Sequence, residues 1–307
     1  MKQKIILIGN PVAGGNAIKK IEKAVGVISN RGFDVRLMLT TRKGDAESFA
    51  REVLRDKSLT SNPQSLPLII AAGGDGTYNE VINGIACTDI PMAILSLGTT
   101  NVLAKELNIP EDIESAVEVA LKGNAHLISL GKITAMLPGE LGTEREYSRY
   151  FCLMAGIGYD GEVVYGVNNR VKKYSGKGSY ILNGIKTLLK WNPEKLIFNI
   201  DGRLCEGYSA IICNASKYAG NFKVAPDAVL NEPFFYAFVM HGRGRLDMLR
   251  YISGIFMGKH LLSKDITCLK AERVEIKGKA RIQIDGDYFG RAPAKIEIVP
   301  DALRLVY

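Results

Sequence analysis

The fold of this chain is organised around residues 71–80, which read AAGGDGTYNE. An apolar run at 66–71, LPLIIA, precedes the turn and is typical of a buried strand. Residues 79–85, NEVINGI, follow and are typical of the start of a helix. A glycine-rich turn between a strand and a helix places backbone N–H groups at the helix N-terminus, where they favour an anion such as phosphate.

Asp75 decides how this turn is interpreted, because many glycine-rich turns only redirect the chain. A carboxylate next to a phosphate group repels it, unless a cation lies between the two or the carboxylate orients a donor. The turn therefore predicts a nucleotide site with a metal ion nearby.

Length, composition and charge describe a globular chain with a basic surface. The 307 residues suffice for two domains, and 47% of them are apolar. No apolar run reaches the roughly 18 residues of a membrane-spanning helix. The five cysteines match neither a metal site nor a disulfide framework, which favours a reducing cytoplasm. The net charge of +8 suits phosphorylated ligands or anionic lipid, and without a nucleic-acid motif we expect no nucleic-acid partner.

Strand and helix patterns alternate through the first part of the chain. The alternation predicts right-handed βαβ units on a parallel sheet. Each expected strand ends in a polar or glycine-rich loop, at Asn10, Thr40, Gly73 and Gly98. Because ligands of such sheets bind outside the carboxyl ends of the strands, we expect the four loops to converge on one crevice.

The pattern changes after about Lys132, where short apolar runs separated by turn residues begin. They predict a β-rich, antiparallel and sandwich-like second domain. We therefore divide the chain into an α/β domain at 1–132 and a β-rich domain at 133–294. For the tail, 295–307, packing back on the first domain is a placement that the sequence leaves open. The expected strands of the second domain lie at 150–156, 196–200, 208–213, 234–240, 273–277, 281–284 and 295–299, with helices at about 246–257 and within 168–191.

The sequence GGDGT at 73–77, followed by NEV at 79–81 and NG at 83–84, resembles the catalytic domain of bacterial diacylglycerol kinases and related lipid and sphingosine kinases. The resemblance spans nearly the whole chain. NAD kinases share the five-residue core, so the longer string makes the resemblance specific. It implies a kinase that uses ATP and Mg²⁺ and transfers the γ-phosphoryl group to a lipid hydroxyl of diacylglycerol type.

The resemblance also implies which residues bind the nucleotide. The segment NPVAGG at 10–15 lacks the lysine of a Walker loop, but the matching segment of the family cradles phosphate. Thr40 opens the family pattern Thr-x-x-x-Gly-Asp, and Thr99 lies in the family motif GTTN. A helix-start turn and a capping threonine are the structural alternatives for the first two. The implied contacts are Asn10, Pro11, Val12, Ala13, Gly14, Thr40, Gly73, Gly74, Asp75, Gly76, Thr77, Tyr78, Asn79, Glu80, Thr99 and Asn101.

The segment IQIDGDYF at 282–289 has two interpretations. Asp-Gly between two strands is a hairpin signal, and Asp201-Gly202 has the same pattern. The matching family segment bears the catalytic base, so the resemblance implies that Asp285 takes the proton from the lipid hydroxyl. Asp75, Asp287 and Lys172 complete the implied catalytic set, and a solvated helix face is the alternative for Lys172.

A metal site is implied at residues 224–234, which resemble a segment that holds a structural magnesium ion in the family. The implied ligands are Glu232, in place of the usual aspartate, and the carbonyl groups of Val229 and Phe234. A surface turn is the alternative. Val102 and Ser129 stand where many relatives have aspartate, which removes two carboxylates from the expected site.

We expect a cytoplasmic enzyme that meets a lipid substrate at the inner face of the membrane, where a basic surface favours anionic lipid. Two alternatives stay open. A NAD kinase shares GGDGT and the two-domain plan, and a non-catalytic nucleotide- or lipid-binding protein would fit the loss of two carboxylates. The sequence also leaves a homodimer open.

Overall fold

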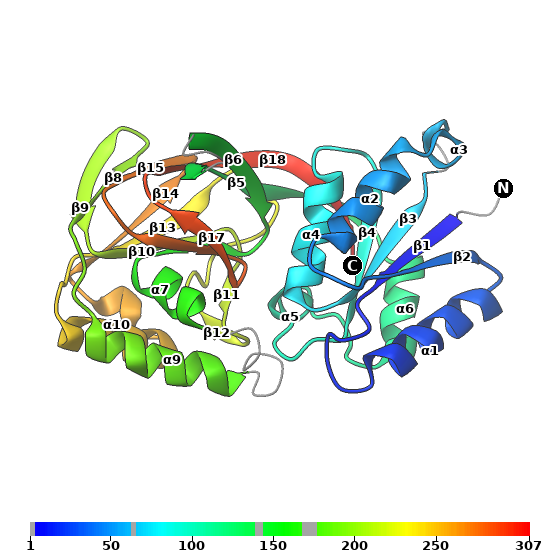
Figure 1. Ribbon diagram of the computed structural model, residues 1–307, viewed down its shortest axis with the longest axis horizontal. Helices are drawn as coiled ribbons and strands as arrows, with labels where there is room; N and C mark the ends of the chain where they lie inside the picture. The colour runs from blue at the N-terminus through cyan, green and yellow to red at the C-terminus, as the bar shows by residue number, and fades with distance from the viewer. Residues whose placement is uncertain (1–3, 63–65, 139–143, 168–176) are drawn as a thin grey trace. The chain divides into compact units, whose positions relative to one another are not determined.

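The computed structural model describes residues 4–62, 66–138, 144–167 and 177–307, and the chain divides into two compact units. The first unit consists of Met1–Ser129 and Pro300–Tyr307, and the second of Leu130–Val299 (Figure 1). The structure thus changes unit three residues before the boundary predicted at Lys132, and the last residues of the tail belong to the first unit.

A parallel sheet with strand order β2-β1-β3-β4 forms the centre of the first unit. Helix α2 packs on α4 and helix α1 on α6, so that helices cover both faces of the sheet (Figure 1). This explains why every residue of β3 is buried and why its sequence is apolar without alternation. The strands are β1 (Lys4–Gly9), β2 (Asp34–Leu39), β3 (Leu68–Gly73) and β4 (Pro91–Ser96). The helices are α1 (Ala17–Asn30), α2 (Asp45–Arg55), α3 (Lys57–Thr60), α4 (Asp75–Ile85), α5 (Val102–Glu106) and α6 (Ile113–Lys122).

The tail extends this sheet. The end of β18 (Ala294–Val306) runs parallel to β4, with Arg304 opposite Pro91 and Leu305 opposite Met92. Leu305 is fully buried there, while the Arg304 guanidinium pairs with Asp89 at 3.0 Å. The apolar residues of the tail thus find their burial at the edge of the parallel sheet.

Two antiparallel sheets build the second unit and confirm the predicted fold class. One has the strand order β14-β13-β10-β7-β16-β17, and the other combines β9-β8-β15-β18 with β5 and β6. The strands are β5 (Ala125–Pro138), β6 (Glu144–Phe151), β7 (Met154–Ile157), β8 (Leu196–Ile200), β9 (Arg203–Gly207), β10 (Ser209–Cys213), β13 (Phe235–Met240), β14 (Ile266–Ala271), β15 (Arg273–Lys277), β16 (Arg281–Ile284) and β17 (Asp287–Arg291), with a separate pair β11 (Lys217–Tyr218) and β12 (Phe222–Lys223).

The central strands of the first of these sheets are buried on both faces. Along β10, Ala210 and Ile212 join the core between the two sheets, while Ile211 and Cys213 join a second core on the opposite face. Helix α9 (Lys177–Lys190) and helix α10 (Arg245–Phe256) lie along this second face (Figure 1). Alternate side chains of one strand therefore enter different cores, as the period of two requires.

Some elements of the second unit have a weak apolar pattern, and for β9 and β17 the Asp-Gly turn before each strand was the only sequence signal. Strands β9 and β17 read RLCEG and DYFGR, and their register comes from hairpin partners rather than from apolar alternation. Helix α7 (Tyr159–Gly166) was not predicted, because glycine and aspartate interrupt its apolar residues. In the part of the chain that the structure describes, no helix is long and apolar enough to span a membrane.

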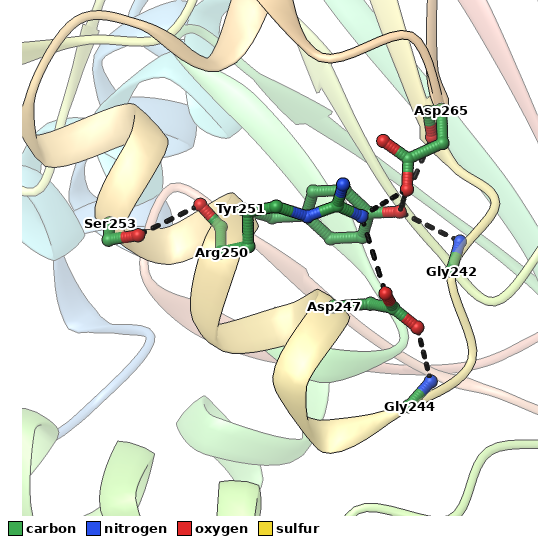
Figure 2. A network of polar contacts seen from close by, with 7 residues as sticks. All are labelled: Gly242, Gly244, Asp247, Arg250, Tyr251, Ser253 and Asp265. Atoms are coloured by element: carbon green, nitrogen blue, oxygen red, sulfur yellow. Dashed lines mark hydrogen bonds and ion pairs between the residues drawn. The ribbon is translucent and has the colours of Figure 1, made fainter.

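A polar network holds the start of helix α10 (Figure 2). The hydroxyl of Tyr251 accepts the backbone N–H of Gly242 at 2.8 Å and donates to the Asp265 carboxylate at 2.5 Å. The same carboxylate pairs with Arg250, which also contacts Asp247 at 3.3 Å. Tyr251 is fully buried, and burial together with the bond to Asp265 raises its pKa to about 12, so the phenol stays a donor.

The substitution Tyr251→Phe should lower the free energy of unfolding by about 1–3 kcal/mol, because it leaves the half-buried N–H of Gly242 without this acceptor and the Asp265 carboxylate without this donor. Urea denaturation of the purified protein measures this. Tyr236→Phe is the matched control, since the Tyr236 hydroxyl makes only a 3.4 Å contact at an exposed position. Equal unfolding midpoints for the two variants would contradict the prediction.

Candidate functional site

The loops that follow the strands of the first unit meet at the carboxyl edge of the sheet. The backbone N–H of Asn10 donates to the carbonyl of Ala72 at 2.9 Å, and that of Leu97 to the carbonyl of Gly73 at 2.8 Å. The Asn10 side-chain amide reaches the hydroxyl of Thr77 at 3.3 Å. The loops after β1, β3 and β4 are therefore bonded directly to one another.

Glycine permits this close approach at two positions. A Cβ atom on Gly14 would lie 2.4 Å from the carbonyl oxygen of Leu97, and one on Gly98 would lie 2.8 Å from Cα of Gly74. Any larger residue would push these loops apart. Gly14 and Gly98 are thus needed so that the loops after β1, β3 and β4 can pack against one another.

Asp75 is the first residue of α4, and its carboxylate joins this helix to the next one. One oxygen accepts the backbone N–H of Val102 at 3.0 Å and the other accepts that of Leu103 at 3.1 Å. Burial raises the pKa of Asp75, and these two N–H groups act against that rise. Because a carboxylate oxygen can accept more than one bond, this role leaves room for a further contact.

Tyr78 and Asn79 of the central motif direct their side chains into the protein. The buried Tyr78 hydroxyl donates to the carbonyl groups of Gly73 and Leu95, at 2.9 and 3.0 Å. Asn79 is buried and its side-chain oxygen accepts from Asn83.

Glu80 performs a similar structural task for the loop that follows β2. Its carboxylate accepts the backbone N–H of Gly44 at 2.9 Å and that of Ala46 at 3.2 Å, at the start of α2. Thr40, which opens this loop, is itself buried. The side chains of Tyr78, Asn79 and Glu80 thus all have structural contacts, and the Glu80 carboxylate, like that of Asp75, can accept a further bond.

Other predicted contacts are open to solvent at the same edge of the sheet. Val12 is 69% exposed, and Gly76 and Thr99 are exposed as well. The side-chain amide of Asn101 donates to the carbonyl of Gly98 at 2.7 Å. The accessible surface at the strand ends therefore consists mainly of loop backbone and small side chains, as in sites that bind phosphate through N–H groups.

The two positions that depart from the family pattern lie inside the first unit. Val102 is 8% exposed and Ser129 is 1% exposed. The backbone N–H of Val102 is bound by Asp75. An uncharged side chain is what such burial favours at both positions.

Asp285 lies in the two-residue turn between β16 and β17, and three backbone groups hold its carboxylate. The N–H groups of Cys152, Leu153 and Met154 donate to it at 2.8, 2.9 and 3.1 Å. Its own N–H donates to the carbonyl of Met154 at 3.0 Å. The φ angles of Asp285 and Gly286, 47° and 84°, define the hairpin turn that the sequence pattern indicates.

The Asp201-Gly202 turn between β8 and β9 has the same construction. Its φ angles are 47° and 87°, and its carboxylate accepts the N–H groups of Glu272 and Arg273 at 2.9 and 2.8 Å. The N–H of Asp201 in turn donates to the carbonyl of Arg273. Backbone geometry therefore does not distinguish Asp285, the predicted base, from Asp201, and the sequence pattern does not distinguish them either. We refer to the turn at Asp201-Gly202 as the twin turn.

The remaining predicted catalytic residues give less information. Asp287 opens β17 and is half-buried, opposite Ile284. Lys172 lies outside the residues that the structure describes, so its assignment stays a prediction.

The predicted metal ligands form a turn in which Glu232 donates its backbone N–H to the carbonyl of Val229 at 3.0 Å. Among the described residues, the Glu232 Oε2 atom has no hydrogen-bond partner although it is buried. A buried carboxylate oxygen of this kind fits a hard cation, which would complete its shell with carbonyl groups such as that of Phe234 and with water. The described ranges contain no cluster of three or more acidic, histidine or cysteine side chains, so most ligands of such a cation would be carbonyl groups and water.

Sequence reasoning missed a polar group next to Asp285. Asp160 is a buried acid in the first turn of α7, and the side chain of Gln283 binds it. The available signal was an isolated aspartate within the glycine-rich apolar stretch MAGIGYDGEVV at 154–164.

Comparison with known proteins covers both units. Residues 4–133 match the family model described as the diacylglycerol kinase catalytic domain, and residues 154–307 match the YegS C-terminal NAD kinase beta sandwich-like domain. The diacylglycerol kinase of Bacillus subtilis (strain 168) is 30% identical over 298 residues, which cover 94% of this chain and 91% of that protein. The diacylglycerol kinase of Staphylococcus carnosus (strain TM300) is 26% identical over 96% of this chain and 92% of its own length.

Solved structures show the same fold. A crystal structure described as a diacylglycerol kinase of Bacillus anthracis str. Sterne aligns with a TM-score of 0.76 at 24% identity. The alignment covers 99% of this chain and 95% of that one. Yeast NADH kinase, solved with NADH, has a TM-score of 0.50 at 12% identity and covers 100% of this chain and 84% of its own. At these identities the likeness concerns the fold alone. The match to the B. subtilis enzyme along nearly its whole length, together with the two family models, shows that the chain belongs to the diacylglycerol kinase family.

Proposed function

We propose that the chain is an ATP-dependent lipid kinase, which transfers the γ-phosphoryl group of ATP to the hydroxyl of a diacylglycerol-like lipid. The observation that carries this proposal is the continuous family match, which includes the catalytic-domain model on the first unit. A kinase needs a phosphate-binding edge and a group that accepts the proton of the acceptor hydroxyl. The two units each offer one of these.

The first unit would bind ATP at the carboxyl edge of its parallel sheet. Its α4 helix, 11 residues long, begins at Asp75 directly after β3, so its first N–H groups belong to the glycine-rich turn. Gly76 and Thr99 leave that edge open to a ligand. A Mg²⁺ ion bound with the nucleotide would neutralise phosphate charge, and Asp75 is the carboxylate in the turn that fits such an ion.

The second unit would supply Asp285 as the base that takes the proton from the lipid hydroxyl. Three N–H bonds hold its carboxylate in one orientation, and a fixed orientation is what general-base catalysis requires. Because the acceptor is a lipid, the enzyme would work as a peripheral protein at the cytoplasmic face of the membrane. The net charge of +8 would favour anionic lipid there.

Incubation of the protein with γ-labelled ATP, Mg²⁺ and a total lipid extract tests this proposal, with NAD offered as acceptor in a parallel reaction. A labelled lipid product, identified by mass spectrometry, is the expected result. Labelled NADP would instead establish the NAD kinase. Binding of ATP or lipid without transfer to any acceptor would indicate the non-catalytic alternative, which the uncharged Val102 and Ser129 favour.

The substitution Asp285→Asn should lower kcat by at least about 100-fold, because the amide cannot accept the proton. Asp201→Asn is a matched control, since it makes the same change in a turn of the same backbone geometry. Both variants should lose similar thermal stability, while Asp201→Asn keeps its rate within about twofold. Initial rates at saturating ATP measure kcat, and melting temperatures measure the loss of stability in each variant. Full turnover of Asp285→Asn would refute the assignment of Asp285 as the base.

Addition of Mg²⁺ without nucleotide should raise the melting temperature of the wild-type protein if Glu232 holds a structural cation. At a concentration 100 times the dissociation constant, the stabilisation amounts to about 2.7 kcal/mol. Glu232→Gln should abolish the shift, whereas Glu146→Gln, at an exposed glutamate of the same unit, should retain it. A shift that survives Glu232→Gln would place the cation elsewhere.

A further inference from the structure

The Asp285-Gly286 turn and the twin turn of the second unit differ in the buried side chains that contact them. Asp285-Gly286 and Asp201-Gly202 share their φ angles and the capture of backbone N–H groups by the aspartate. Among the residues that the structure describes, the first of them is connected to a buried polar network and the second is not. This difference distinguishes two turns that sequence and backbone geometry leave equivalent.

The network starts at Gln283, which lies two residues before Asp285. Gln283 is only 2% exposed. The side-chain oxygen of Gln283 accepts the backbone N–H of Gly286 at 2.8 Å, and its side-chain NH₂ group donates to one oxygen of Asp160 at 2.6 Å. The other oxygen of Asp160 accepts the hydroxyl of Tyr218 at 2.6 Å. An unbroken series of hydrogen bonds therefore links Tyr218 to the turn.

A glycine on the neighbouring strand makes room for the central contact. Gly156 of β7 lies opposite Gln283 in the antiparallel register. A Cβ atom at this position would lie 2.0 Å from the Asp160 carboxylate and 2.7 Å from the Gln283 amide nitrogen. The Asp160–Gln283 pair thus exists only because β7 carries no side chain there.

The twin turn forms without such support. Asn199 occupies the corresponding position, two residues before Asp201, and its amide nitrogen makes a 3.4 Å contact with Glu275. In the described part of the chain, the side-chain oxygen of Asn199 has no hydrogen-bond partner. A hairpin of this geometry therefore needs no polar network to fold.

The network is also costly. Burial raises the pKa of Asp160, because a carboxylate inside the protein loses its hydration, and the bonds from Tyr218 and Gln283 only partly offset this. Apolar side chains of similar volume would often fill such a space with equal or greater stability. A network that folding does not require, and that costs stability, is best explained by a need for one defined orientation.

We propose that Asp160 is a positioning residue that fixes the orientation of the Gln283 amide and, through it, the Asp285-Gly286 turn. The Asp160 oxygen that faces Gln283 accepts a hydrogen bond, so it selects the NH₂ end of the Gln283 amide and leaves the carbonyl end for Gly286. Without Asp160 the amide can reverse, and its NH₂ group would then meet the Gly286 N–H, donor against donor. The turn would lose the bond between Gly286 and Gln283, and the Asp285 carboxylate, although still held by the N–H groups of Cys152, Leu153 and Met154, would lie on a less firmly fixed backbone.

The functional consequence rests on the proposed role of Asp285 as the base. A displacement of about 1 Å at a catalytic group costs up to roughly 100-fold in rate. The nucleotide-binding residues lie in the other unit, so the KM for ATP should stay unchanged when kcat falls.

The test compares Asp160→Leu, Gln283→Met and the double variant with Asn199→Leu, the same kind of change at the twin turn. Hydrogen exchange of peptides that contain Gly286 or Gly202 measures positioning without any activity assay. Lipid phosphorylation measures kcat and the KM for ATP. The double variant replaces both partners of the Asp160–Gln283 bond by apolar groups, so it should regain the stability that each single variant loses at this bond, although the Tyr218 hydroxyl and the Gly286 N–H still lose these acceptors.

Exchange at Gly286 should become about 10-fold faster or more in all three network variants, while exchange at Gly202 stays the same. Their kcat should fall about 10- to 100-fold with an unchanged KM for ATP, also in the double variant, and Asn199→Leu should match the wild type. Recovery of kcat together with stability in the double variant would reduce Asp160 to a stabilising role and overturn the inference, as would unchanged exchange at Gly286. If the wild-type protein phosphorylates no lipid, the proposed function fails, and the exchange data alone decide whether Asp160 positions the turn.

Discussion

Backbone N–H groups at the starts of loops and helices need acceptors, and this chain supplies them with carboxylates from distant segments. Asp75 binds the start of α5, Glu80 binds the start of α2, and Asp285 binds the segment that leads into β7. The contacts of Asp75 and Glu80 supply acceptors at helix starts, where the first N–H groups have no partner within the helix, and Asp285 does the same for the bend before β7. Charge-assisted bonds of this kind are stronger than neutral ones, so they fix the loops that surround the proposed site.

Because these carboxylates bind backbone N–H groups, the motifs at 73–80 and 282–289 have a structural role in addition to the role that the family resemblance implies. Residues that a family resemblance assigns to nucleotide or proton transfer also hold the structure together, and for Tyr78 the structural contacts occupy the side-chain hydroxyl. Asp75 combines both possibilities, since its oxygens each accept one N–H and retain capacity for another contact. Loss of activity after substitution of such residues therefore needs a structural control before a catalytic role is assigned.

The second unit shows how a common element acquires a special environment. Type I′ turns with Asp-Gly recur wherever two antiparallel strands join tightly, and the unit uses the same solution twice. At one of them Gly156 opens space for a buried carboxylate and an amide behind the turn. Satisfied buried networks specify one arrangement at the expense of stability, which suits a position where orientation matters more than strength.

The sequence by itself determined the alternation of the first unit, the β-rich character of the second, the turn at Asp285 and the family. These features depend on apolar periodicity, glycine and short motifs, which are local properties of the chain. Edge strands such as β9 and β17 were indicated only by the Asp-Gly turns before them, because their pairing, rather than their composition, makes them strands. Only the tertiary structure decided where the tail packs and which groups the carboxylates bind. The partners of Asp75, Glu80 and Asp285 lie 27, 36 and 133 residues away in the sequence, and hydrogen bonds over such distances leave no local pattern.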